Sequence, residues 1–337
     1  MLIGRRATLA IPAILASTRA VRAAETVRLG LLHTLSPAPF YLAKQHGLWT
    51  AQGVGVEFHF FEAAQPIAAA AVSGDIDVGI TALTGGFFSL AGKGELVVIG
   101  GGLHEQKGVE LTAFLVSRQA YDAGLTAISK MPGHSFGLTQ YGSSFHYMMG
   151  RLAQIDGFDI RSVKLRALQT IGNMAAAVRT NQVDATMAIA SVARPLIDSG
   201  EVKLLGWVGD EVPYQITALF TTRSMITKRA DALHRFCQGY QAGVAQYREA
   251  FLHFGPDGKP IYGPATDAAI AAITKYVFTG DPAAATKIKD GIGWYDAGGA
   301  LDVADVRAQL AWFTAEDMVK GQIDPATIID TAFLPAR

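Results

Sequence analysis

The chain has little cysteine: Cys237 is the only one among 337 residues. A lone cysteine cannot form an internal disulfide. It lies in an expected helix, so we predict a small buried apolar side chain. No cysteine follows the apolar segment near the N-terminus, so the sequence does not predict a lipid-anchored form.

A block of basic charge is also missing. Lys and Arg number 29, and Asp and Glu number 29. Four of the arginines and none of the acids fall within residues 1–23, so the remainder carries 29 − 4 = 25 basic against 29 acidic residues, a balance of −4. A weakly acidic chain of this kind is a poor candidate for binding nucleic acid or an anionic membrane.

Motifs of common enzymes and metal sites are incomplete or absent. His104-Glu105 opens like a zinc-protease motif, but Gly108 stands where the second histidine belongs. The eight histidines are scattered, and there is no spaced Cys/His set, G-x-S-x-G or P-loop. The glycines at 100–102 lack the continuation of a dinucleotide fingerprint. We therefore expect no catalytic residue, no metal and no cofactor.

Residues 1–24 have the features of a signal peptide. Arg5 and Arg6 form a positive start, the stretch 7–17 is apolar, and small residues precede a cleavage site near Ala23. The arginine pair also suits twin-arginine export, so the Sec and twin-arginine routes both stay open. The alternative is an ordinary N-terminal helix. Eleven apolar residues are too few to span a bilayer, so we expect no permanent membrane anchor. The signal-peptide features therefore predict export to a periplasm and cleavage.

One pattern occurs twice. Residues 69–80 read AAAVSGDIDVGI and residues 175–189 read AAAVRTNQVDATMAI. Each is an Ala-rich helix, a polar turn, an aspartate (Asp77 or Asp184) and a short apolar strand. A repeated strand–helix–strand unit predicts two similar parallel α/β lobes with a cleft between them. We expect both aspartates to fix turns and not to contact a ligand.

The rest of the chain extends this pattern. Residues 112–117 (TAFLVS) and 217–221 (TALFT) resemble each other and are candidates for the two strands that cross between lobes. We expect lobe I to comprise 25–118 and 217–337, and lobe II to comprise 119–216. Further strands are predicted at 27–31, 56–61, 76–80, 97–100, 134–138, 163–167, 185–189 and 202–207. Beyond 222 the chain is predicted to be helical, at 228–254, 266–278, 282–289 and 303–320.

Five segments together resemble a known family. They are PFYLAKQHGLWTAQGVGVEFHFFE (39–62), AVSGDIDVGIT (71–81), HSFGLTQYGSS (134–144), NQVDATMAI (181–189) and AWFTAEDMVKGQIDPATIIDTAFL (311–334). The chain resembles periplasmic substrate-binding proteins of the nitrate/taurine/sulfonate type (NMT1/THI5-like), which serve ATP-driven importers. The tail departs from the family where Glu316-Asp317 replaces a glycine.

The resemblance implies an α/β fold of two Rossmann-like lobes joined by two hinge strands, the type II periplasmic-binding-protein fold. It implies a small-molecule ligand trapped by hinge closure, delivery to a membrane permease, a monomer and no catalysis.

Ligands of open α/β sheets bind beyond the carboxyl ends of the strands. The loop that follows each predicted strand is therefore a candidate for ligand binding. The predicted ligand-binding residues are Thr34, Ser36, Glu62, Gln65, Thr81, Thr84, Tyr141, Gly142, Ser143, Ser144, His146, Asn173, Ser191 and Tyr214.

The turn Gly142-Ser143-Ser144 is the strongest of these candidates. It lies between a strand and a helix, and a helix N-terminus offers free N–H groups and partial positive charge to a carboxylate or sulfonate. The alternative is that one serine is simply the N-cap of the helix. Both interpretations are compatible.

Aromatic and charged residues near these loops bear on the ligand. Tyr141 and Phe145 flank the turn and would suit a flat organic ligand, whereas most other nearby aromatics are expected in the core. Among Lys and Arg only Arg194 falls near a nominated loop. Glu62 would repel an anion but would bind an aminopyrimidine edge; its alternative is a solvated loop carboxylate. The scarcity of Lys and Arg near these loops and the presence of Glu62 together weaken a simple nitrate or taurine assignment.

The ligand therefore stays open among a sulfonate, an aromatic or other carboxylate, and a pyrimidine-like solute. An enzyme of the thiamine-pyrimidine synthase type is the rival hypothesis. The resemblance implies that such an enzyme needs a cysteine cluster, and this chain has a single cysteine. A third interpretation is a periplasmic protein that presents its ligand to a membrane sensor.

Overall fold

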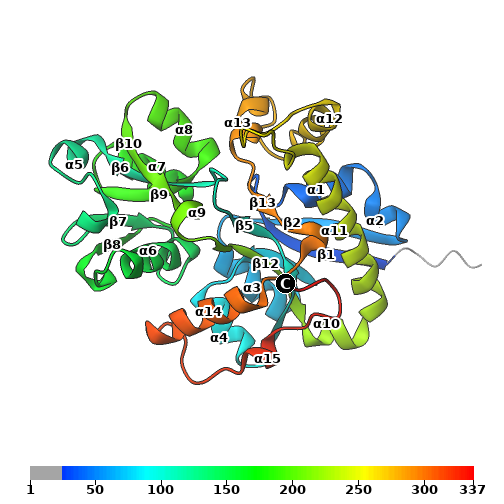
Figure 1. Cartoon of the computed structure of the whole chain (residues 1–337). Helices are drawn as coiled ribbons and strands as arrows, with labels where there is room; N and C mark the ends of the chain where they lie inside the picture. The colour runs from blue at the N-terminus through cyan, green and yellow to red at the C-terminus, as the bar shows by residue number, and fades with distance from the viewer. Residues whose placement is uncertain (1–24) are drawn as a thin grey trace, which may run out of the picture.

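The computed structural model describes residues 25–337, which form two α/β lobes side by side (Figure 1). The predicted signal peptide, residues 1–24, lies outside the described residues. Among the described helices, none is both long and apolar enough to cross a membrane.

The first lobe is built on a five-stranded sheet with the order β2-β1-β3-β12-β4, in which only β12 is antiparallel to its neighbours. Its strands are β1 (Glu25–Leu32), β2 (Val54–Phe61), β3 (Val78–Ala82), β4 (Leu96–Gly101) and β12 (Thr217–Thr222). Its helices are α1 (Ala38–Gln45), α2 (Leu48–Ala51), α3 (Ala64–Ser73), α4 (Gly85–Ala91), α10 (Arg223–Lys228), α11 (Ala230–Phe251), α12 (Pro264–Ile273), α13 (Ala284–Asp290), α14 (Val303–Ala315) and α15 (Pro325–Ile328).

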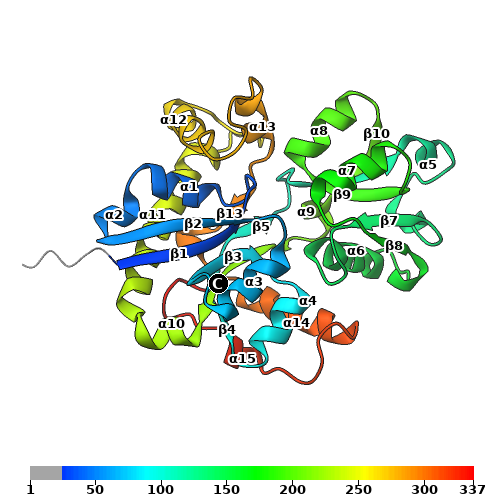
Figure 2. The ribbon, with the colours of Figure 1, turned by 180° about the vertical axis from the view of Figure 1, so that it is seen from behind.

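The second lobe repeats this topology with the order β8-β7-β9-β6-β10, and its antiparallel strand is β6. The strands are β6 (Thr112–Ser117), β7 (Ser135–Leu138), β8 (Lys164–Ala167), β9 (Ala185–Ile189) and β10 (Val202–Trp207). The helices are α5 (Arg118–Asp122), α6 (Ser144–Ile155), α7 (Ile171–Arg179), α8 (Ala190–Asp198) and α9 (Val208–Glu211). The predicted fold class is therefore confirmed (Figure 2).

Short strands join the lobes. β5 (Leu103–Glu105) pairs with β11 (Tyr214–Gln215) and with β13 (Trp294–Tyr295) in a small hinge sheet. The predicted first lobe, 25–118 and 217–337, includes β6, but all pairing partners of β6 lie in the second sheet. By its pairing β6 belongs with the predicted second lobe (119–216), so the crossing lies before Thr112. The similarity of 112–117 to 217–221 does not reveal which strands each segment pairs with.

The repeated aspartates have the same role in both lobes. Asp77 accepts a hydrogen bond from the N–H of Arg28 at 2.8 Å, and Asp184 accepts one from the N–H of Ser135 at 2.8 Å. In each lobe the donor lies on the neighbouring parallel strand, 49 residues earlier. Asp77 also pairs with the guanidinium of Arg229 at 2.9 Å. Each aspartate thus aligns the start of its strand with the adjacent strand.

The predicted helix 228–254 corresponds to α11, which begins at Ala230 and ends at Phe251. It is separated from the preceding α10, which ends at Lys228, by Arg229 with φ −136°. The Arg229 side chain reaches Glu25 and Asp77, which fixes the break. Helix α14 ends at Ala315, five residues before the predicted end, and Asp317 has a left-handed φ of 57°.

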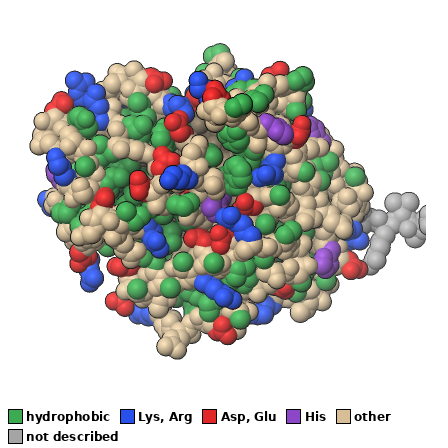
Figure 3. All heavy atoms as spheres, in the orientation of Figure 1, with side chains coloured by type: hydrophobic (Ala, Val, Ile, Leu, Met, Phe, Trp, Pro, Cys, Tyr) green, Lys and Arg blue, Asp and Glu red, His purple; other side chains and the backbone are tan. Residues whose placement is uncertain are grey.

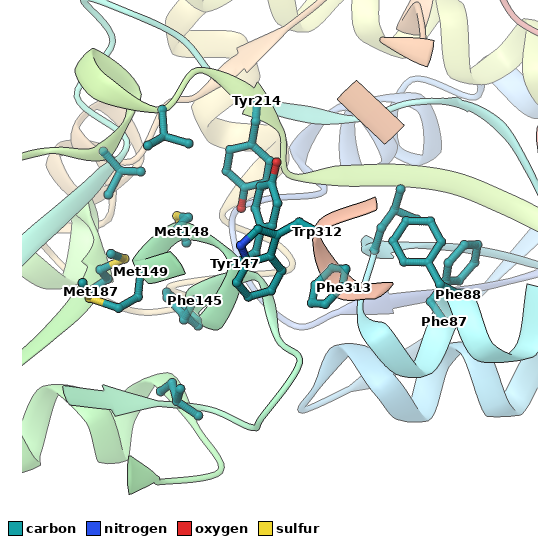
Figure 4. Close-up of a cluster of buried hydrophobic side chains, with 14 of the residues drawn as sticks. Phe87, Phe88, Phe145, Tyr147, Met148, Met149, Met187, Tyr214, Trp312 and Phe313 are labelled. Carbon is teal, nitrogen blue, oxygen red and sulfur yellow. The ribbon is translucent and has the colours of Figure 1, made fainter. Parts of the chain in front are cut away.

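Buried apolar side chains of residues 25–337 form three clusters. The largest extends from the first lobe, through α14, into the second. Figure 4 shows its centre, with Trp312 beside Tyr147, and Phe313 between that pair and the phenylalanines of α4. The other two clusters are each confined to one lobe. The two lobes therefore share a continuous core on one side only.

Candidate functional site

An inner cavity of about 90 Å³ lies where the strand ends of both lobes meet the hinge. Its lining is apolar with several hydroxyl groups and contains no charged side chain. The lining residues are Leu32, Thr34, Ser36, Ala82, Leu103, Leu111, Thr112, Ser144, Phe145, Met148, Ile171, Ile189, Ile216 and Thr217. Apolar walls with a few polar groups are the usual composition of a small-molecule site.

A larger outer cavity of about 410 Å³ adjoins the inner one and shares Thr34, Ile171 and Ile189 with it. Its first-lobe wall includes His33, Leu35 and the segment 276–279. Its second-lobe wall comes from the starts of α7 and α8. The two cavities together form one cleft between the lobes.

Three helices of the second lobe begin at this cleft. No hydrogen-bond acceptor within residues 25–337 is found for the backbone N–H groups of Ser144 and Phe145 in α6, Ile171 and Gly172 in α7, or Ser191 and Val192 in α8. All six residues line one or both cavities. Free N–H groups and the aligned helix dipoles create a positive potential suited to an anionic group.

The described part of the chain places no fixed cation in the lining of the cleft. Neither cavity is lined by Lys or Arg, and the Nε2 of His33 is 2.7 Å from the carbonyl oxygen of Tyr276, to which it donates. Glu105 lies behind the lining residue Thr112, and burial raises the pKa of this carboxyl to about 8. This carboxyl is therefore largely neutral at pH 7. Elsewhere on the surface, Figure 3 shows acidic and basic side chains interspersed.

Residues 35–250 match the family described as NMT1/THI5 like. The chain belongs to the NMT1/THI5-like family. The comparison with curated protein sequences found no match.

Solved structures share the fold of this NMT1/THI5-like chain. The alkanesulfonate-binding protein SsuA from Xanthomonas axonopodis pv. citri, bound to MOPS, is 19% identical, with a TM-score of 0.70 over 92% of this chain and 100% of that one. The periplasmic aliphatic sulphonate binding protein SsuA from Escherichia coli is 18% identical, with a TM-score of 0.69 over 90% and 97%. The ligand binding component of an ABC-type import system from Staphylococcus aureus, with zinc bound, is 13% identical, with a TM-score of 0.69 over 92% and 97%.

Four of the predicted ligand-binding residues of the NMT1/THI5-like chain line the cleft. They are Thr34, Ser36, Ser144 and Ser191. The hydroxyls of Thr34 and Ser36 are 3.1 Å apart on the first-lobe side. Ser191 is 5% exposed, and its Oγ has no hydrogen-bond partner among the described residues. A buried hydroxyl without a partner is costly unless a ligand or water completes it.

The rest of the Gly142-Ser143-Ser144 turn is used by the protein itself. Ser143 is the N-cap of α6 and accepts from the N–H of His146. The N–H of Gly142 donates to the Nδ1 of His146 at 3.1 Å, and its carbonyl accepts from the N–H of Gly85 across the lobes at 3.0 Å. Burial lowers the pKa of His146 to about 4, so its ring is a neutral acceptor here. The N-cap interpretation thus holds for Ser143, and contact of Ser144 with a ligand stays a prediction.

The other predicted residues lie outside the lining of both cavities. Glu62 and Asn173 are exposed, and Gln65 lies beside Gly86. Thr84 caps α4, and Tyr141 donates its hydroxyl hydrogen to the carbonyl of Leu165. Thr81 and Tyr214 are buried, and neither hydroxyl has a hydrogen-bond partner within residues 25–337. Their contact with a ligand stays a prediction.

Sequence reasoning missed the hinge and first-lobe parts of the lining. Leu103 and Ile216 come from or beside two- and three-residue strands, and Tyr276 to Thr279 follow α12. Thr112 and Thr217 are the first residues of β6 and β12. Thr112 and Thr217 occupy equivalent positions in the similar segments 112–117 and 217–221, and this similarity could have indicated both as lining residues. No group of three His, Cys, Asp or Glu side chains among residues 25–337 is arranged to hold a metal ion.

Proposed function

We propose that this chain is the periplasmic solute-binding component of an ATP-driven importer and captures a small organic solute between its lobes. The observation that carries the proposal is the cleft, where strand ends and helix starts from two similar lobes enclose an apolar cavity beside the hinge. Family membership and the shared fold of SsuA support it. A membrane permease is the partner that this role requires.

The arrangement of the cleft favours a ligand with an anionic head and an apolar body. The free N–H groups of α6, α7 and α8 suit a sulfonate or carboxylate. The unpartnered hydroxyl of Ser191 supplies a further donor. The apolar lining residues and the aromatic rings of Tyr276 and Phe278 suit the body. An anion held without Lys or Arg relies on these donors alone.

We propose no catalytic role. The cavity lining consists of apolar side chains, hydroxyls and one histidine, His33, whose Nε2 is engaged by Tyr276. Cys237 is buried in the first-lobe cluster, and burial raises the pKa of its thiol. A thiol held this way is a poor nucleophile.

Thermal unfolding of the protein without residues 1–24 tests the proposal. Matched solutes share a butyl body and differ in the head: butanesulfonate, pentanoate and neutral butanesulfonamide. A ligand at 100 times its dissociation constant should add about 2.7 kcal/mol of stability. We expect the anions to stabilise more than the amide. Stabilisation by the amide alone would overturn the anionic head, and no shift from a broad panel of solutes would overturn solute binding.

A further inference from the structure

One wall of the outer cavity contains a strained residue. Phe278 lines that cavity and has a φ of 59°. The other non-glycine residues within 25–337 that have a positive φ are Gln169, Asn181 and Asp317. Asparagine and aspartate adopt this left-handed conformation readily, whereas a bulky side chain rarely does. Phe278 is the aromatic residue of this group, and it lies at the cleft.

The strain arises where the chain leaves α12. The N–H of Val277 donates to the carbonyl oxygen of Ile273 at 3.2 Å, and Phe278 follows in the left-handed conformation. Glycine is the usual residue at this place after a helix, because it has no Cβ to clash. The carbonyl oxygen of Phe278 accepts from the N–H of Asp281 at 3.0 Å, which closes the next turn. The chain thus has phenylalanine where the backbone alone favours glycine.

Two further rings line the same side of the cavity, those of His33 and Tyr276. The Tyr276 ring stacks on Tyr41 with the ring centres 4.6 Å apart. The Nε2 of His33 donates to the carbonyl oxygen of Tyr276, as described above. Contacts within the first lobe therefore fix both rings. We call His33, Tyr276 and Phe278 the aromatic wall.

The Phe278 ring is held from outside the cavity. The Nζ of Lys287 lies 5.7 Å from the centre of this ring, a cation–π contact, and pairs with a carboxylate oxygen of Asp281 at 2.6 Å. Lys287 and Asp281 are not part of the cavity lining. The contact therefore orients the ring and leaves its cavity side available to a ligand.

The opposite side of the cavity supplies hydrogen-bond donors. Gly172 at the start of α7 and Val192 at the start of α8 have the free N–H groups described above. Ser191 adds a hydroxyl that is buried and has no partner among the described residues. Donors of the second lobe and rings of the first thus line one cavity of about 410 Å³. An anionic group held by these donors has its body beside the aromatic wall.

We propose that Phe278 is a specificity-determining residue, and that the solute is an aromatic sulfonate or carboxylate whose ring packs on Phe278. Backbone strain of this kind persists where the surrounding structure and the function require the side chain. Glycine would relax the backbone but would remove the ring. Aromatic rings gain more from each other than from an aliphatic group of similar area. The inference rests on the solute-binding function proposed above and narrows its solute class.

Two sulfonates with six-carbon rings test the aromatic preference. Benzenesulfonate and cyclohexanesulfonate share the head and differ in the body. We expect titration calorimetry to show that the parent binds benzenesulfonate about threefold to tenfold more tightly. Phe278→Leu keeps an apolar side chain and should abolish the preference. Phe254→Leu, which changes a phenylalanine outside the lining of both cavities, should keep it.

The outcomes separate this proposal from the proposed function. Equal affinities of the parent for the two sulfonates would overturn the aromatic class. A preference that survives in Phe278→Leu, or that is lost equally in Phe254→Leu, would overturn the assignment to Phe278. If butanesulfonate binds and benzenesulfonate does not, the aromatic class fails and the solute-binding function stands. If no solute binds, both fail.

Thermal unfolding without ligand tests the strain. Phe278→Gly and Phe278→Ala both remove the ring, but only glycine relieves the left-handed conformation. We expect the glycine variant to melt about 1 to 3 °C above the alanine variant. Thr274, the C-cap of α12 with a φ of −63°, is the control, because there alanine should melt above glycine. The same order at both positions would show that Phe278 is not strained.

Discussion

At the scale of single residues, Ser144 tests the helix start at the cleft. It is the first residue of α6, after an N-cap whose ψ of 171° is compatible with a following proline. Ser144→Pro deletes one free N–H and should weaken anion binding about tenfold, since a hydrogen bond to a charged group contributes about 1.5 kcal/mol or more. Titration calorimetry and thermal unfolding would measure affinity and stability separately.

Ser144→Ala is the control, because it removes the hydroxyl and keeps the N–H. Unchanged affinity in Ser144→Pro would remove the start of α6 from the site. Loss of the fold in Ser144→Pro would instead contradict the view that proline fits the first turn of this helix.

Glu105 gives a pH-dependent prediction at the same scale. The native state holds its proton more tightly than the unfolded chain, because burial raises the pKa from 4.5 to about 8. The stability that this group contributes is therefore lost as pH rises from about 4.5 through about 8. Glu105→Gln should raise the melting temperature by an amount that grows between pH 5 and pH 8.5.

The exposed Glu211 provides the comparison, since Glu211→Gln should show no such trend. An equal gain for Glu105→Gln at both pH values would mean that Glu105 is already ionised in the native protein.

At the scale of elements, the aspartates that precede the central strands β3 and β9, Asp77 and Asp184, allow a matched comparison. Asp77 is more buried than Asp184, with 10% against 38% of the side chain exposed, and it pairs with Arg28 and Arg229. Both carboxyls have pKa values below their usual range. Desolvation alone would raise these pKa values, but hydrogen bonds from Arg28 to Asp77 and from Ser135 to Asp184 outweigh it. Their stabilising contribution is present above pH 4 and is lost as pH falls through the lowered pKa.

We expect Asp77→Asn to lower the free energy of unfolding by about 2 to 3 kcal/mol and Asp184→Asn by about 1 kcal/mol. Urea denaturation at pH 7 would measure both, and at pH 3 both differences should shrink. A larger loss for Asp184 would mean that the backbone hydrogen bond, and not the paired arginines, dominates.

The helix α6 gives a second prediction at this scale. Alanine normally stabilises a helix interior relative to glycine, but Gly150 of α6 lies against Trp312 of α14. Gly150→Ala should therefore destabilise the protein by about 1 to 3 kcal/mol through overpacking. Trp312→Phe should relieve part of this loss in the double variant. A stabilised Gly150→Ala protein would show that the two helices are not held together there.

Most elements were predictable from local pattern. The strands 112–117, 185–189 and 202–207 have the bounds that their apolar runs indicate. The hinge strands β5, β11 and β13 were not, because two or three residues are too few to show a period. The hydroxyls Thr34, Ser36, Ser144 and Ser191 follow from the rule that ligands bind at strand ends. The apolar wall from Leu103 and Ile216 depends on how the hinge folds, which no local pattern contains.

At the scale of the whole molecule, the position of the largest cluster decides how the lobes can move. A core that continues from one lobe to the other cannot separate without exposing aromatic rings to water. The contact of α8 with α13 is made by Gly291 against Ser191 and by the partly exposed ion pair of Arg194 and Asp290, and it can separate at little cost. Closure on a solute is thus expected to be a rotation about one side, with the energetic gain coming from the ligand that bridges the cleft.

The pairing of β12 also bears on the order in which the protein can be completed. The second sheet is made entirely from residues 112–207, so it can form as soon as that stretch of chain is available. The first sheet has β12 between β3 and β4, and β12 follows β4 by more than a hundred residues of chain. Until residue 222 has been synthesised, β3 and β4 lack the strand that separates them. During synthesis from the N-terminus the second lobe is therefore the one ready to fold first, and the first lobe is the one that needs protection from aggregation.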